Sequence, residues 1–144
     1  MLVKDYQHRL GSLIRNAPNE IELPASYQNF FDETGSTSAV PNDRRSSVRM
    51  RVRTSGILIP RRWLPAFPRT AAPMTIYTKD FSKTGFGFVA HQQYFPGEQV
   101  RVILATFWME IEVRRCRRLG PACYEAGGIL LERHDTSLEA FLDT

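Results

Sequence analysis

The sequence has few cysteines and no long apolar run, and both shortages narrow the class of protein. Cys116 and Cys123 are the only 2 cysteines among 144 residues, and their C-x6-C spacing matches no common zinc arrangement. We therefore expect reduced thiols, with Cys116 partly buried near a strand end, and neither a disulfide scaffold nor a metal site. No apolar stretch approaches the roughly 18 residues of a membrane span, and the first residues lack a secretory signal, which predicts a cytoplasmic protein.

Lysine is scarce in the second part of the chain, although that part is basic. Residues 1–40 carry 3 basic and 5 acidic side chains, whereas residues 41–144 carry 16 basic and 10 acidic side chains. Of those 16, 14 are arginines, and only Lys79 and Lys83 are lysines. Arginine presents a planar fork of donors that fits phosphates and guanine edges. The excess indicates an anionic, planar partner, while composition alone leaves a solvated basic surface as the other interpretation.

Residues 1–40 are expected to form an N-terminal extension that is partly helical. Apolar residues recur there at helical three- and four-residue steps: Val3, Tyr6, Leu10, Leu13 and Ile14. Pro18 ends this pattern, and residues 24–31 are a candidate second short helix. Residues 33–43 are small and polar, as in a linker, so we place the domain boundary near residue 41.

After residue 41 the pattern becomes typical of short strands. Segments rich in aromatic and β-branched residues, separated by Gly and Pro turns, occupy residues 49–59, 73–78, 85–90, 99–104, 108–114 and 124–132. Residues 41–144 are therefore predicted to be mainly β, a six-stranded antiparallel β-barrel of Greek-key type, whose closure removes exposed edges. The proline-rich stretch 60–73 is an excursion between the first two strands. A short C-terminal helix over 135–142, capped by Asp135, is expected to pack on the barrel.

An arginine cluster is the first candidate binding element. Arg44, Arg45 and Arg49 lie where the linker meets the first strand. Clustered guanidiniums on a flexible segment can bind phosphates in bidentate fashion and can bind the O6 and N7 acceptors of guanine. A second basic run, at residues 114–118, is interpreted as a solvated strand end, with an auxiliary anion contact as the alternative.

A polar turn between the second and third strands is the second candidate element. Asp80 can accept hydrogen bonds from guanine N–H groups, and the Ser82 hydroxyl can donate or accept. Gly85 has no Cβ, so a ligand ring can approach the backbone there. Donors on one element and acceptors on the other suit an anionic guanine nucleotide. Capping of a turn is the other common role of an aspartate such as Asp80, and no nucleophile elbow surrounds Ser82, which disfavours a hydrolase.

These two elements resemble the motifs of the PilZ domain family of bacterial cyclic di-GMP receptors. The family pattern is R-x3-R before the first strand and D/N-x-S-x2-G on a strand turn, and both occur here in order. The resemblance covers roughly residues 43–134, and residues 124–129 are similar to the family's last barrel strand. It implies a six-stranded barrel without enzymatic activity or cofactor, and ligand contacts from Arg45, Arg49, Asp80, Ser82 and Gly85. Arg44, directly before the first motif, implies capture of an intercalated pair of ligand molecules.

Three functions remain open from the sequence. The favoured one is a cyclic di-GMP receptor in bacterial second messenger signalling, whose ligand orders the arginine segment over the barrel and changes a surface for an unknown downstream protein partner. The second is a PilZ-like adaptor that binds protein alone. The third is a small basic barrel that binds single-stranded nucleic acid through aromatics such as Phe86 and Phe88, although nucleic acid is not the expected partner.

Overall fold

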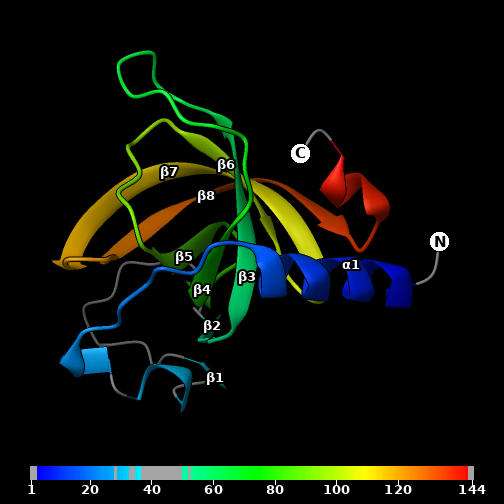
Figure 1. Cartoon of the computed structure of the whole chain (residues 1–144), viewed down its shortest axis with the longest axis horizontal. Helices are drawn as coiled ribbons and strands as arrows, with labels where there is room; N and C mark the ends of the chain where they lie inside the picture. The colour runs from blue at the N-terminus through cyan, green and yellow to red at the C-terminus, as the bar shows by residue number, and fades with distance from the viewer. Residues whose placement is uncertain (1–2, 28, 33–34, 37–49, 52, 143–144) are drawn as a thin grey trace.

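Antiparallel strands close into a six-stranded β-barrel (Figure 1). The computed structural model describes residues 3–27, 29–32, 35–36, 50–51 and 53–142. The barrel strands are β3 (Ser55–Arg62), β4 (Met74–Phe81), β5 (Gly85–Ala90), β6 (Gln99–Ile103), β7 (Phe107–Gly120) and β8 (Cys123–Asp135). They lie in the order β4-β3-β6-β7-β8-β5, and a pairing between β5 and β4 closes the barrel. The pairings of β3 with β6 and of β5 with β8 join strands that are far apart in the sequence. The predicted mainly β, six-stranded antiparallel barrel is confirmed.

The barrel interior is filled by apolar side chains that alternate along the strands. Its buried members include Leu58, Ile76, Phe86, Phe88, Val102, Met109, Ile111 and Val113. Phe86 and Phe88 are at most 1% exposed, and their rings stack on one another at 5.8 Å between centroids. The two aromatics named for the nucleic-acid interpretation are therefore core residues, because alternation along β5 turns both inward, and they present no ring to a base.

The long loop after β3 is fastened to the connection between β5 and β6. Arg69 in the loop meets Glu98 in a two-pronged ion pair, Nε to Oε1 at 2.5 Å and Nη2 to Oε2 at 2.9 Å, with both side chains at most 5% exposed. Arg69 also lies over the ring of Tyr94, which is fully buried in the barrel core. Burial raises the pKa of the Tyr94 phenol to about 12. The predicted excursion at residues 60–73 therefore begins later than expected, because β3 runs on to Arg62. The buried ion pair of Arg69 and Glu98 holds the loop in place.

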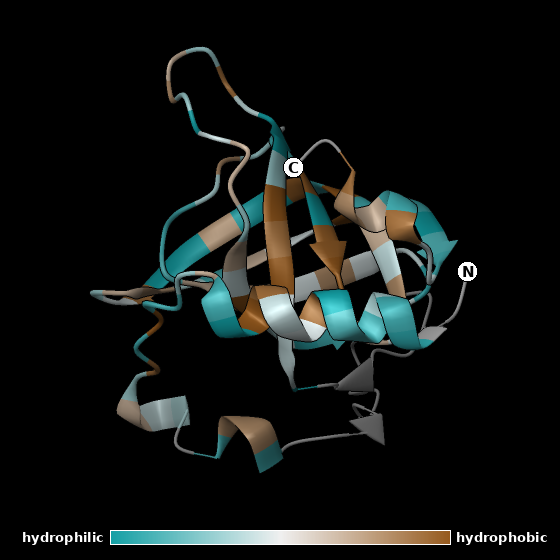
Figure 2. Cartoon of the chain, turned by 45° about the vertical axis from the view of Figure 1, so that its right-hand side comes forward, coloured by the Kyte–Doolittle hydropathy of each residue, from teal (hydrophilic) through white to brown (hydrophobic). Residues whose placement is uncertain are grey.

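The N-terminal helix α1 (Val3–Asn16) forms where the helical spacing predicted it and lies across the outside of the barrel (Figures 1 and 2). Tyr6 and Leu10 are buried against Ile57 and Ile59 of β3. The Tyr6 hydroxyl lies 2.5 Å from the carbonyl oxygen of Leu104, to which it donates. Coverage of β3 on both faces explains why its sequence is apolar without alternation.

The segment after α1 forms two 3₁₀ turns, η1 (Ala25–Tyr27) and η2 (Phe30–Asp32), where a second short helix was predicted. Phe30 is buried against Val89 and Cys123, so tertiary packing replaces helical hydrogen bonding here. The segment continues into the short strand β1 (Gly35–Ser36), which lies within the predicted linker and pairs with β2 (Met50–Arg51). The predicted domain boundary near residue 41 lies outside the described residues.

The C-terminal segment is a single 3₁₀ turn, η3 (Leu138–Phe141), rather than a helix over 135–142. Asp135 was wrongly predicted as its cap, because Asp135 ends β8 and pairs with Phe107, and Ser137 occupies the cap position. Phe141 is buried beside α1, whereas Leu142 is 58% exposed.

The two cysteines agree with the sequence prediction. Both are free thiols, and Cys116 is partly buried while Cys123 is fully buried. Burial raises the pKa of each thiol. Within the described part of the chain, no helix has the length and apolar character needed to cross a bilayer.

Candidate ligand-binding site

Three of the six predicted site residues lie together at the hairpin between β4 and β5. The backbone N–H of Ser82 donates to the carbonyl oxygen of Gly85 at 2.9 Å, and the N–H of Gly85 donates to the Ser82 hydroxyl oxygen at 3.2 Å. Asp80 lies two residues before Ser82 on β4 and is only 9% exposed. The Ser82 hydroxyl keeps its own proton available for donation, while its oxygen helps to close the turn.

A β-bulge aims the Asp80 carboxylate at the outer face of the barrel. Strict alternation would turn Asp80 inward together with Ile76 and Thr78, which are fully buried. The register of β4 against β5 shifts between Thr78 and Asp80, with Lys79 as the extra residue. Phe81 then returns to the core. The bulge therefore turns a carboxylate that strict alternation would place in the core toward the outer face, where it stays largely covered.

The strand β2 links the arginine motif to this hairpin. Arg51 pairs with Asp80, and Met50 pairs with Phe81, on the edge of β4 that is shared with β3. The predicted first strand is therefore present as two pieces, β2 and β3, with different registers on β4. Arg44, Arg45 and Arg49 lie outside the described residues.

An ion-pair network centred on Glu125 lies beside the bulge. The Glu125 carboxylate accepts hydrogen bonds from the Tyr27 hydroxyl at 2.5 Å and from the Lys79 ammonium at 2.9 Å, and Arg117 lies 3.4 Å away. Burial alone would raise the pKa of Glu125, but these hydrogen bonds and the charges of Lys79 and Arg117 outweigh it and lower the pKa to about 2. Burial raises the pKa of the Tyr27 phenol, and the hydrogen bond to Glu125 raises it further. Glu125 thus fastens the N-terminal segment to β8 next to the site.

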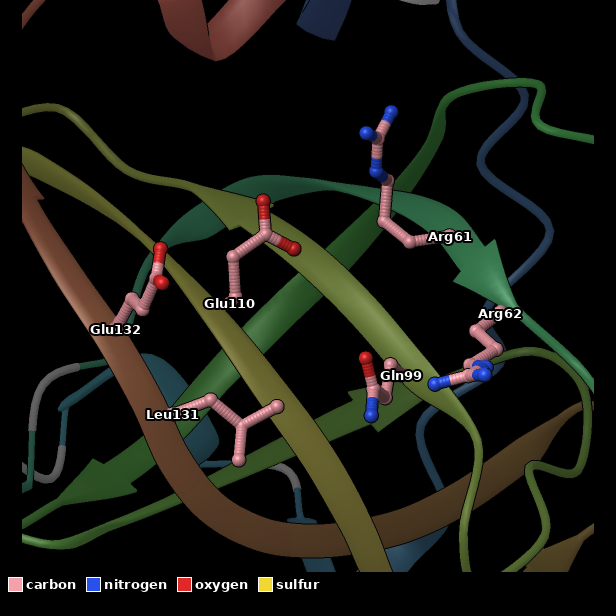
Figure 3. A pocket seen from close by; sticks show the side chains of 6 residues that line it. All are labelled: Arg61, Arg62, Gln99, Glu110, Leu131 and Glu132. Carbon is pink, nitrogen blue, oxygen red and sulfur yellow. The ribbon is translucent and has the colours of Figure 1, made fainter.

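A cavity of about 490 Å³ lies elsewhere on the barrel surface, over β3, β6, β7 and β8 (Figure 3). It is lined by Arg61, Arg62, Gln99, Glu110, Leu131 and Glu132. Glu110 forms an ion pair with Arg101 at 2.6 Å. Cations and carboxylates face the same space, so the cavity does not favour a doubly anionic ligand. The predicted site residues that the structure describes, Asp80, Ser82 and Gly85, do not line it.

The sequence analysis named Arg115 only within the basic run 114–118 and Gly127 only within residues 124–129, and it gave Gly87 no role. The strand register places all three in one row with Asp80. Glycine pairs within strands were the available signal, since glycine in a strand often marks a close approach. A glycine in a strand identifies a particular close contact only when the residue paired with it is known.

No protein-family model matches this chain, and no curated protein matches its sequence. The class that the geometry itself defines is a small closed antiparallel barrel with a carboxylate, a hydroxyl and a glycine at one hairpin.

Proposed function

We propose that the chain is a non-enzymatic receptor for cyclic di-GMP, with its site at the β4–β5 hairpin and the arginine motif. The observation that carries the proposal is the pairing of Arg51 with Asp80. The sequence puts Arg49 directly before Met50, so the R-x3-R motif leads straight into the strand that lies against the acidic motif. The two motifs of the PilZ resemblance are 30 or more residues apart in sequence, and a shared site requires such a link.

The chemistry of the two elements is complementary to a guanine dinucleotide. A carboxylate accepts from the N1–H and N2–H groups of guanine, and Asp80 supplies one that is directed to the outer face of the barrel. Guanidiniums bind phosphates and the O6 and N7 edge, which is the role proposed for Arg45 and Arg49. Arg44 is proposed to accompany them, in which case two ligand molecules bind per chain.

A signalling output follows from the strand connections. β1 pairs with β2, and β2 pairs with β4, so backbone pairings join the N-terminal segment to the strand of Asp80. Ordering of the arginine motif by a ligand would therefore act on β1 and on the segment before it. We propose that this change alters the surface offered to a protein partner.

Isothermal titration calorimetry of the full chain with cyclic di-GMP tests the proposal. We expect saturable binding with preference over cyclic di-AMP, and about 5- to 150-fold weaker binding for each of Arg45→Ala, Arg49→Ala and Asp80→Asn. Arg15→Ala, which removes one exposed charge from α1, is the matched control and should bind as the wild type. Absence of binding by the wild type, or equal loss in the control, contradicts the proposal.

The two other functions, a protein-only adaptor and a binder of single-stranded nucleic acid, predict different titration results. A protein-only adaptor binds no nucleotide. Nucleic-acid binding falls steeply as salt rises, because affinity then depends on counterion release from many phosphates. Titration of a single-stranded oligonucleotide at two salt concentrations separates that behaviour from selective binding of a compact dinucleotide.

A further inference from the structure

One row of paired residues crosses four strands on the outer face of the barrel. Asp80 on β4 pairs with Gly87 on β5, Gly87 pairs with Gly127 on β8, and Gly127 pairs with Arg115 on β7. Directly paired residues point to the same face of a sheet. The row therefore has a carboxylate at one end, a guanidinium at the other, and no side chain on the two positions between them.

A second β-bulge brings Arg115 into this row. Val113 is fully buried and Cys116 packs against the same core, although strict alternation would put residues three apart on opposite faces. The register of β7 against β8 shifts between Val113 and Arg115, with Arg114 as the extra residue. Both bulges thus turn a charged side chain outward onto the glycine pair.

One face of the Arg115 guanidinium is turned toward the space over Gly127. The position that a Cβ of Gly127 would occupy is 2.9 Å from Cζ, 3.0 Å from Nη2 and 3.2 Å from Nε of Arg115. The central carbon can be the nearest atom only when a point lies over the face of the guanidinium, because in the plane the nitrogens surround it. Arg115 is an exposed residue, so its side chain is open to solvent.

Arg115 differs from its neighbours in the basic run. Arg114 forms an ion pair with Glu112 at 3.0 Å, and Arg118 donates to the carbonyl oxygen of Gly120 at 3.1 Å. Arg117 contacts Glu125. The Arg115 side chain forms no hydrogen bond or ion pair with the residues that the structure describes. Among these residues its charge has no partner, and its guanidinium is positioned by contact with Gly127.

We propose that Arg115 is a stacking platform for a purine ring of the ligand that binds at Asp80. The inference rests on the proposed function and adds a ligand contact from β7 that neither motif contains. A guanidinium stacks on aromatic faces, and the gain is larger when the plane is already oriented. Paired Cα atoms on neighbouring strands are about 4.5–5.5 Å apart, so the Arg115 guanidinium beside Gly127 and the Asp80 carboxylate beside Gly87 occupy adjacent positions of the row.

Calorimetry with cyclic di-GMP on four variants of the full chain tests the platform. Arg115→Ala and Arg115→Lys should both weaken binding by roughly 2- to 30-fold, because lysine keeps the charge but has no plane. Gly127→Ala should weaken it as well, since the added Cβ would stand 2.9 Å from Cζ and displace the guanidinium. Arg114→Ala removes one equal charge at the next residue and should stay within twofold of the wild type.

Each outcome decides the inference. Wild-type affinity in Arg115→Lys means that charge alone suffices, and it overturns the platform, as does unchanged affinity in Arg115→Ala. If the wild type binds and Arg45→Ala weakens binding while both Arg115 variants do not, only this inference fails. If the wild type binds no cyclic di-GMP, the proposed function fails, and the inference fails with it.

Discussion

Asp80 Oδ1 lies 2.8 Å from the position that a Cβ of Gly87 would occupy, so the carboxylate of β4 rests on the bare backbone of β5. Any side chain at residue 87 would have to share that space. The glycine is thus part of the proposed binding site, although it contributes no polar side chain of its own. The proposed acceptor keeps its direction only while its paired position stays empty.

Gly87→Ala should displace the Asp80 carboxylate and destabilise the protein. Overpacking of this kind costs about 1–3 kcal/mol, and chemical denaturation measures the change in the free energy of unfolding. Gly11→Ala on α1, where an added Cβ meets only the end of Arg15 at 3.4 Å, is the control and should be neutral or stabilising. A Gly87→Ala protein of wild-type stability would contradict the close contact.

Glu98→Gln should be strongly destabilising, because it leaves the Arg69 guanidinium buried without its ionic partner. Loss of one member of a buried pair typically costs about 3–5 kcal/mol. The measurement is urea denaturation of Glu98→Gln, Arg69→Met and the double variant. We expect the double variant to lose less than the sum of the single losses, and strict additivity would show that the two side chains are not coupled.

Tyr6→Phe should loosen α1 from the barrel without creating a cavity. The variant removes the hydroxyl that lies 2.5 Å from the Leu104 carbonyl oxygen and 3.1 Å from that of Phe107. The Phe107 carbonyl oxygen still accepts from the N–H of Leu104 at 2.9 Å, so the loss falls on the Leu104 carbonyl oxygen. Leaving one buried acceptor unsatisfied costs about 1–3 kcal/mol. Thermal or urea unfolding measures the loss, and faster amide exchange in α1 should accompany it. Unchanged unfolding would show that α1 contributes little to the stability of the barrel.

Glu125 should make the stability of the protein depend on pH in the acid range. Its pKa is lowered from 4.5 to about 2 in the folded chain, so its contribution is complete above pH 4.5 and disappears as the pH falls toward 2. In Glu125→Gln we expect this part of the pH dependence, on the order of 2 kcal/mol, to be absent from urea unfolding curves. Glu20→Gln, at a mostly exposed carboxylate, should retain the wild-type dependence.

The strands were predictable because their signals are local. Alternation in residues 108–114 and aromatic residues in 85–90 mark strands whatever they pair with, and β7 and β5 cover both segments. The prediction of a helix over 135–142 was wrong because a contact distant in the sequence outweighed the local signal. Its helical spacing is local, but Asp135 is already committed to pairing with Phe107, a partner 28 residues away.

The candidate site divides in a similar way. Asp80, Ser82 and Gly85 could be named from a short motif, and the hairpin that unites them is itself local. Gly127 and Arg115 could not, because their place beside Asp80 depends on the register of β5, β8 and β7. A one-residue change in either bulge would turn the corresponding charge toward the core.

The order of amino acids by itself determined that this protein is built of short strands, with a basic, arginine-rich second part and a helix at the start. Period and composition act over a few residues and need no partner strand. Only the tertiary structure decided which residues meet: Arg51 pairs with Asp80, and the Arg115 guanidinium lies against the space over Gly127. Such meetings are set by barrel closure and bulges, where the packing of the whole core selects one register among several that the local sequence permits.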